Sequence, residues 1–127
     1  MSSAFGLSKI GQIAIPVTDI DRAVAFYRDV LGMKFLFQAP PPGLGFFDCG
    51  GVRLMLDLPA REQAGRGGVL YYKVDDLQAT FDTLSARGVA VEAKPHLIAR
   101  MPDHELWMAF FRDPDGNAFA LMAEVRS

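Results

Sequence analysis

The chain lacks the features that would tie it to a membrane, a nucleic acid or a disulfide framework. Its single cysteine, Cys49, excludes an intrachain disulfide. No apolar run approaches the roughly 20 residues that a membrane-spanning helix needs. Lys and Arg are scattered over a chain of net charge -2, so no basic stripe indicates a nucleic acid partner. Residues 1–7 have no basic stretch before a long apolar run, so they do not read as a signal peptide, and the simplest expectation is a cytoplasmic protein.

Half of the 127 residues are hydrophobic, which is enough for one compact core, and we expect a single domain over residues 1–127. The order of predicted elements occurs twice within it. The first half predicts a strand, a helix with apolar spacing from Ile20 to Leu31, another strand, a loop and a hairpin. The second half repeats this order, with a helix from Leu77 to Leu84. The predicted strands are 12–17, 33–37, 46–48 and 52–58, then 69–74, 89–91, 107–111 and 118–123.

The two halves can be set in register. Val17 and Ile20 match Val74 and Leu77 at an offset of 57 (17 + 57 = 74), and Gly51 matches Gly116 at an offset of 65 (51 + 65 = 116). The sequence therefore predicts an α+β fold of two tandem βαβββ modules, about 9–58 and 68–125, joined by a linker at about 59–67. Each helix would cover one face of its sheet, and the curved mixed sheets would form a cavity of the kind that binds small molecules. A ferredoxin-like domain has other connections and fits the tandem hairpins less well.

Three segments carry a resemblance to a known family: Val17-Thr18-Asp19-Ile20 through Ala25-Phe26-Tyr27, Val30-Leu31-Gly32-Met33, and Arg112-Asp113-Pro114-Asp115-Gly116-Asn117. From about Ile10 to Glu124 the chain resembles the vicinal oxygen chelate superfamily, which includes glyoxalase I, extradiol dioxygenases and the fosfomycin- and bleomycin-resistance proteins. The resemblance implies the two-module fold. It does not choose a reaction, because this fold hosts both metalloenzymes and metal-free binders.

The resemblance also implies four inward positions that hold metal ligands in the metal-dependent members. In this sequence they are Gln12, Val69, Met55 and Ala120. Only Gln12 has a suitable donor, and a thioether is a poor ligand for Zn, Mg, Mn or Fe(II). A two-residue shift at Met55 would substitute Arg53 or Asp57 and add at most one carboxylate. We therefore expect most metal-ligand positions to be lost, and Gln12 either hydrogen-bonds a bound molecule or is satisfied at its strand end.

A relocated site is the alternative. His96, His104 and Glu105 flank or follow residues 97–103, which we expect to form a loop, and together with Gln12 they offer the chemistry of a divalent metal site or an acid/base pair. The simpler interpretation is a polar loop in which His104 bonds across the hairpin, since adjacent strand residues such as His104 and Glu105 point to opposite faces.

Several other side chains are candidates for the cavity. Tyr71 shares a strand face with Val69, and Trp107 is a second aromatic residue with a polar tip, although core packing is the commoner role. Arg53 would pair with an anionic ligand if its face lines the cavity, and would otherwise extend to the rim. Some of the four residues Phe46, Phe47, Phe110 and Phe111 must face the core and some the cavity, and we interpret them mainly as core. The predicted cavity set is Gln12, Arg53, Met55, Val69, Tyr71, His104, Trp107 and Ala120.

These observations favour a metal-free protein that holds a small apolar or aromatic molecule, as bleomycin-resistance proteins hold a drug, and Met122 fits such a cavity. The alternative is a metalloenzyme, a lyase, isomerase or dioxygenase, whose relocated site includes Gln12 and His104, so catalysis stays an open question. A regulatory or dimerisation domain is a third possibility. No cofactor is predicted beyond that possible divalent metal. The expected partners are a small-molecule ligand and a second copy of the chain, because exposed strand edges invite pairing.

Overall fold

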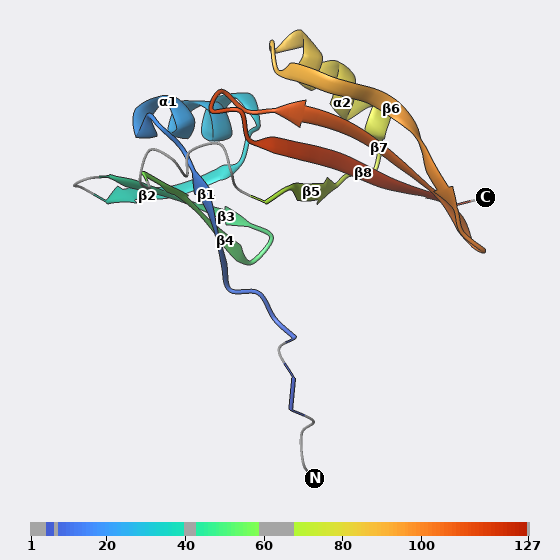
Figure 1. Ribbon diagram of the computed structural model, residues 1–127, viewed down its shortest axis with the longest axis horizontal. Helices are drawn as coiled ribbons and strands as arrows, with labels where there is room; N and C mark the ends of the chain where they lie inside the picture. The colour runs from blue at the N-terminus through green and yellow to red at the C-terminus, as the bar shows by residue number, and fades with distance from the viewer. Residues whose placement is uncertain (1–4, 7, 40–42, 59–67, 127) are drawn as a thin grey trace.

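The structure is a computed structural model that describes residues 5–6, 8–39, 43–58 and 68–126 (Figure 1). The predicted linker at 59–67 and the prolines of the first loop, Pro40 to Pro42, lie outside the described residues. No helix within the described ranges has the length and apolar character that crossing a bilayer requires.

Two modules of the same topology make up the described chain. One sheet has the strand order β1-β4-β3-β2 and the other has the order β5-β8-β7-β6. The first strand of each sheet is parallel to the last strand of its module, and the other pairs are antiparallel. The predicted α+β fold of two βαβββ modules is therefore confirmed. The elements are β1 (Gln12–Pro16), α1 (Ile20–Ala25), the π-helical turn η1 (Phe26–Val30), β2 (Lys34–Ala39), β3 (Leu44–Cys49), β4 (Val52–Asp57), β5 (Leu70–Lys73), α2 (Leu77–Ala86), β6 (Ala90–Arg100), β7 (His104–Arg112) and β8 (Ala118–Arg126).

Each helix begins at an aspartate. The Asp19 carboxylate accepts a hydrogen bond from the Arg22 N–H at 3.1 Å, and the Asp76 carboxylate accepts one from the Ala79 N–H at 3.0 Å. These bonds satisfy backbone donors that have no partner inside the helix. The first helix then widens into η1, and Gly32 ends it with a positive φ of 72°.

The register that relates the modules is visible in the strand pairs. In the first sheet Ile13 lies opposite Leu54, and in the second Leu70 lies opposite Phe119. These pairs are related by the two offsets read from the sequence (13 + 57 = 70 and 54 + 65 = 119). The middle strands β3 and β7 follow an offset of 64, so Phe46 and Phe47 correspond to Phe110 and Phe111. Equivalent positions can therefore be compared residue by residue.

One predicted element is wrong. The sequence placed a strand at 89–91 and a loop at 97–103, but β6 continues to Arg100 and only Met101 to Asp103 separate it from β7. The register of β6 against β7 shifts at three places, and such bulges break the simple alternation that identifies a strand. The resulting long hairpin extends beyond α2 (Figure 1).

The core lies between the helices and one face of each sheet. Phe47, Leu56 and Phe111 are fully buried there, whereas Phe46 and Phe110 lie on the opposite sheet faces. The four phenylalanines thus divide between the core and the opposite faces, and the interpretation that they are mainly core is correct only for Phe47 and Phe111.

A polar junction ties the modules together through the turn at 113–117. The buried Tyr27 hydroxyl donates to the Asp113 carboxylate at 2.8 Å, and the Asn117 side-chain amide donates to the Pro16 carbonyl at 2.8 Å. The side chain of Asp115 has no exposed surface and pairs with Arg22 at 2.8 Å. Burial and the neighbouring Asp113 carboxylate raise the pKa of Tyr27 well above its ordinary range.

Candidate functional site

Each sheet has one face that a helix covers and one that it does not. Along β1 and β4, buried Ile15, Leu54 and Leu56 point toward α1, and the alternate residues point away from it. The same alternation holds at the end of β7 under α2, whereas in β8 Ala120 on the uncovered face is buried as well. Both helices lie on the same side of the molecule in Figure 1, so the two uncovered faces are both turned away from the helices. We call them free face one, in the first module, and free face two, in the second.

Free face one combines an aromatic stack with two polar side chains. The rings of Phe37 and Phe46 are stacked with centroids 4.6 Å apart, and the Arg53 guanidinium carbon lies 5.9 Å from the centre of the Phe46 ring. Gln12 stands beside Arg53 in the parallel pair, and its Nε2 lies 3.8 Å from the Met55 sulfur. The structure therefore brings the predicted cavity residues Gln12, Arg53 and Met55 together.

Free face two is also aromatic but has smaller residues at its centre. Tyr71 contacts Phe110 edge-on at 6.2 Å, and the His96 ring lies 6.2 Å from Phe110 on the same face. Ala120 lies opposite both Tyr71 and Phe110, and Val69 directly precedes β5. Tyr71 is 49% exposed and Val69 is 43% exposed, so both are accessible to a bound molecule.

Trp107 does not share this face. It packs against the core cluster on the helix-covered side, because it has the same parity along β7 as buried Ala109 and Phe111. Its indole N–H donates to Glu105 at 3.1 Å. Trp107 lines a separate hollow of about 330 Å³ near the start of α2, together with Asp75, Pro95 and Ala123. The expectation that Trp107 reaches the same cavity as Tyr71 is therefore wrong.

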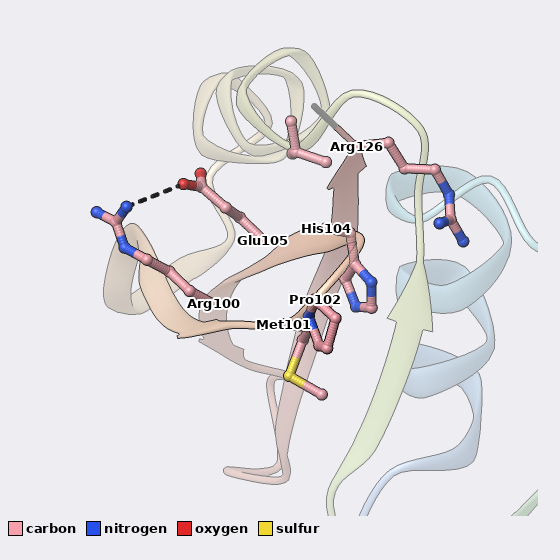
Figure 2. Close-up of a pocket in the computed structure, with 7 residues that line it drawn as sticks. Arg100, Met101, Pro102, His104, Glu105 and Arg126 are labelled. Carbon is pink, nitrogen blue, oxygen red and sulfur yellow. Dashed lines mark ion pairs between the residues drawn. The ribbon is translucent and has the colours of Figure 1, made fainter.

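His104 lies at the far end of the β6–β7 hairpin. Its Nδ1 is 2.7 Å from the Asp103 carboxylate, which also pairs with Arg126 at 2.7 Å. Arg126 and His104 hold the pKa of Asp103 at about 2. Glu105 points to the other side and pairs with Arg100 at 3.4 Å (Figure 2). Arg100, His104, Glu105 and Arg126 line a hollow of about 320 Å³, and their charges are largely neutralised by the Arg100–Glu105 and Arg126–Asp103 pairs.

The proposed members of a relocated metal site are not brought together. His96 lies opposite Met108, four residues along β7 from His104, and Gln12 belongs to the other sheet. The Nδ1 of His96 is 2.7 Å from the Lys94 carbonyl oxygen. In the part of the chain that the structure describes, no three His, Cys, Asp or Glu side chains are grouped so that they could hold a metal ion.

Sequence reasoning missed the contribution of Phe37, Phe46 and Phe110 to the free faces. The signal was present in the hairpin turns. Counting back from Met55 through the Gly50-Gly51 turn places Phe46 directly opposite it, and directly opposite residues share a face.

The comparison with known families agrees with this architecture. Residues 9–121 match the model of the Glyoxalase/Bleomycin resistance protein/Dioxygenase superfamily. The chain belongs to this superfamily. It is 31% identical over 125 residues to the uncharacterized protein YraH of Bacillus subtilis strain 168, covering 86% of this chain and 93% of that one. It is 30% identical over 118 residues to a probable lactoylglutathione lyase of Vibrio cholerae, covering 84% and 83%.

Solved structures of superfamily proteins are similar over almost their full length. TnmS3, an antibiotic-binding protein from Streptomyces sp. CB03234, is 26% identical with a TM-score of 0.76, covering 95% of this chain and 99% of that one. A lactoylglutathione lyase from Agrobacterium tumefaciens is 28% identical with a TM-score of 0.71, covering 93% and 95%. Two solved structures of similar identity to this chain are thus described as an antibiotic-binding protein and as a lactoylglutathione lyase.

The residues at the superfamily's metal positions do not fit a divalent ion. Gln12 and Met55 contact each other on free face one, while Val69 and Ala120 belong to the second module. Together they supply one neutral amide oxygen and one thioether, whereas Zn, Mg and Mn require several nitrogen, oxygen or thiolate donors. Asp57 follows Met55 by two residues along β4 and would add one carboxylate.

Proposed function

We propose that this protein binds a small, largely aromatic molecule against its free sheet faces, without a metal ion. The observation that carries the proposal is the chemistry of these faces. Aromatic rings are exposed on these faces, and Phe37 and Tyr71 are each 49% exposed. Rings of this kind offer apolar area with few rotatable bonds, which suits a flat organic ligand.

The likeness to TnmS3 supports this proposal, because that protein is described as antibiotic binding and has the same fold over 95% of this chain. The likeness to lactoylglutathione lyases supports the alternative, a metalloenzyme that uses Gln12 and His104. His104 lies at the far end of the β6–β7 hairpin and pairs there with Asp103, which favours the binder.

We further propose that a second copy of the chain completes the binding cavity. The two free faces of one chain are both turned away from their helices, and they are bordered by exposed Leu36, Phe37 and Ile98. Leu36 and Phe37 lie on β2 and Ile98 lies on β6, the edge strands of the two sheets, and exposed strand edges invite pairing with a second chain. In a two-fold dimer, a free face of one chain would lie over a free face of the second chain, and the cavity would form between them.

The test uses protein from which metal ions have been removed with a chelator, and the chelator is then removed as well. N-phenyl-1-naphthylamine fluoresces in apolar surroundings, and we expect saturable binding that added Mn, Fe(II), Ni or Zn does not improve. Phe46→Ala and Tyr71→Ala should weaken binding, and Val91→Ala, an exposed apolar control on β6, should not. The absence of saturable binding, or binding that appears only with a metal, contradicts the proposal. Sedimentation equilibrium reports the oligomeric state independently.

A further inference from the structure

Free face one is built as two parallel rows of side chains of different chemistry. One row consists of residues that lie opposite one another on neighbouring strands, from β2 to β1: Lys34, Asp48, Arg53 and Gln12. The next row crosses them as Phe37, Phe46, Met55 and Ala14. Successive residues on one face of a strand are about 7 Å apart, and this is the spacing between the two rows. A ligand whose ring packs on the aromatic row can therefore place a substituent on the charged row.

The charged row has an excess of one positive charge. Lys34 and Arg53 flank Asp48, whose carboxylate accepts a hydrogen bond from the Gly51 N–H at 3.2 Å. The Arg53 side chain lies over the Phe46 ring, and among the ion pairs of the described residues none includes Arg53. Its guanidinium donors are therefore available to an incoming acceptor.

Gln12 adds a second donor beside this cation. In the parallel pair its side chain emerges next to Arg53, and its amide nitrogen is directed at the Met55 sulfur 3.8 Å away. A thioether is a weak acceptor, so an oxygen atom of a ligand would readily replace it. Arg53 and Gln12 thus offer two neighbouring donors above an aromatic platform.

The second module has no arginine and glutamine at the equivalent positions. The offsets place Val69 where Gln12 stands and Ala118 where Arg53 stands (12 + 57 = 69 and 53 + 65 = 118). The neighbouring Arg112 is already bound to Glu92 at 3.0 Å and to the Gly116 carbonyl at 2.8 Å. On free face two, Lys73 lies 3.5 Å from Glu124. A charged group on a ligand would therefore be recognised by the first module.

We propose that the ligand is an aromatic anion, with a carboxylate or comparable group attached to a planar ring system. Arg53 binds the anion in a charge-assisted contact, Gln12 donates a second hydrogen bond, and Phe37 and Phe46 pack against the ring. Arg53 is a specificity-determining residue in this arrangement. The inference rests on the proposed function, which requires an aromatic ligand but no charge.

The experiment compares three naphthalenes that differ only in charge: naphthalene-1-carboxylate, naphthalene-1-carboxamide and 1-naphthylmethylammonium. Calorimetric titration into metal-free protein should show affinity in the order carboxylate, carboxamide, ammonium. A hydrogen bond to a charged group supports a preference of about tenfold or more for the carboxylate over the carboxamide. The preference should shrink as salt is raised, because Arg53 is exposed.

Two variants assign the preference to Arg53. Arg53→Gln should bind the carboxylate and the carboxamide equally, and Arg53→Lys should recover part of the preference because it keeps the charge. Arg28→Gln is the matched control, because Arg28 lies over Phe35 at 5.8 Å but pairs with Asp29 beside the first helix. Thermal unfolding verifies that each variant is folded.

The outcomes separate the two proposals. If none of the three compounds binds, the proposed function fails and this inference fails with it. If all three bind equally, the proposed function stands and the inference is wrong. A carboxylate preference that survives in Arg53→Gln also overturns the inference, since the anion would then be recognised elsewhere.

Discussion

The two modules share a backbone register but differ in what they expose. Beneath the helices several equivalent positions are large and apolar, with Phe47 matching Phe111 and Leu54 matching Phe119. On the free faces the equivalent positions diverge, since Arg53 corresponds to Ala118. The repeat therefore specifies much of the core twice, and the two free faces differ in the charge that they carry.

The junction between the modules shows the same kind of divergence. Tyr27 and Asp113 form a buried hydrogen bond across it. The equivalent positions hold Leu84 and Cys49 (27 + 57 = 84 and 113 − 64 = 49), which are less polar. Leu84 lines an apolar hollow of about 170 Å³ with Leu31, Met33 and Tyr72. One half of the junction is fixed by polar contacts, and the other half is packed by apolar side chains.

The largest expected effect comes from removing the equivalent core rings. Phe47→Ala and Phe111→Ala should each lower the free energy of unfolding by about 3–5 kcal/mol, because both rings are fully buried and truncation leaves a cavity. Phe46→Ala and Phe110→Ala, one residue away on the free faces, are matched controls with smaller expected losses. Urea denaturation measures all four. Equal losses at neighbouring positions would contradict the division into a core face and a free face.

A smaller effect should come from the polar half of the junction. Tyr27→Phe removes the donor to Asp113 and should lower the free energy of unfolding by about 1–2 kcal/mol at neutral pH. The pKa of Tyr27 is raised in the folded state, so its contribution is complete below the ordinary tyrosine value of 10.0 and is lost as the pH rises above it. The alkaline fall in stability should therefore be shallower in Tyr27→Phe than in the wild type.

Tyr72 provides a control for that pH dependence. Burial also raises its pKa, but its hydroxyl has no hydrogen-bond partner among the described residues. Tyr72→Phe should flatten the alkaline limb in the same direction without the loss at neutral pH, since no bond is removed. If Tyr27→Phe and Tyr72→Phe lose the same stability at neutral pH, the Tyr27–Asp113 bond contributes nothing measurable.

The sequence predicted the repeat because the signals that define it are local and redundant. The matches of Val17 and Ile20 to Val74 and Leu77 and of Gly51 to Gly116 set the offsets, and alternation placed Arg53 and Met55 on one strand face. These signals do not depend on the rest of the fold.

The errors arose where structure depends on partners distant in the sequence. The bulges that let β6 continue to Arg100 appear only when it is paired with β7. The side on which Trp107 lies follows from the position of α2 over β7, and the isolated β7 sequence is mostly apolar on both faces. The stack of Phe37 on Phe46 needs the shift between Phe35 and Phe37, which a regular alternation does not predict.

The smallest and most direct test of the comparison transfers the cation from one module to the other. In an Arg53→Gln background, Ala118→Arg would place a guanidinium at the equivalent position of free face two, beside Phe110 and Tyr71. We expect it to restore part of the preference for naphthalene-1-carboxylate over the carboxamide, by less than the roughly tenfold ascribed to Arg53.

Two features reduce the gain: Val69 offers no second donor, and Arg112 directly opposite repels the new charge. Ala118→Gln in the same background is the neutral control. A full restoration would mean that position on the repeat alone decides recognition, and no restoration would mean that the neighbouring Gln12 and the Phe37–Phe46 stack are required.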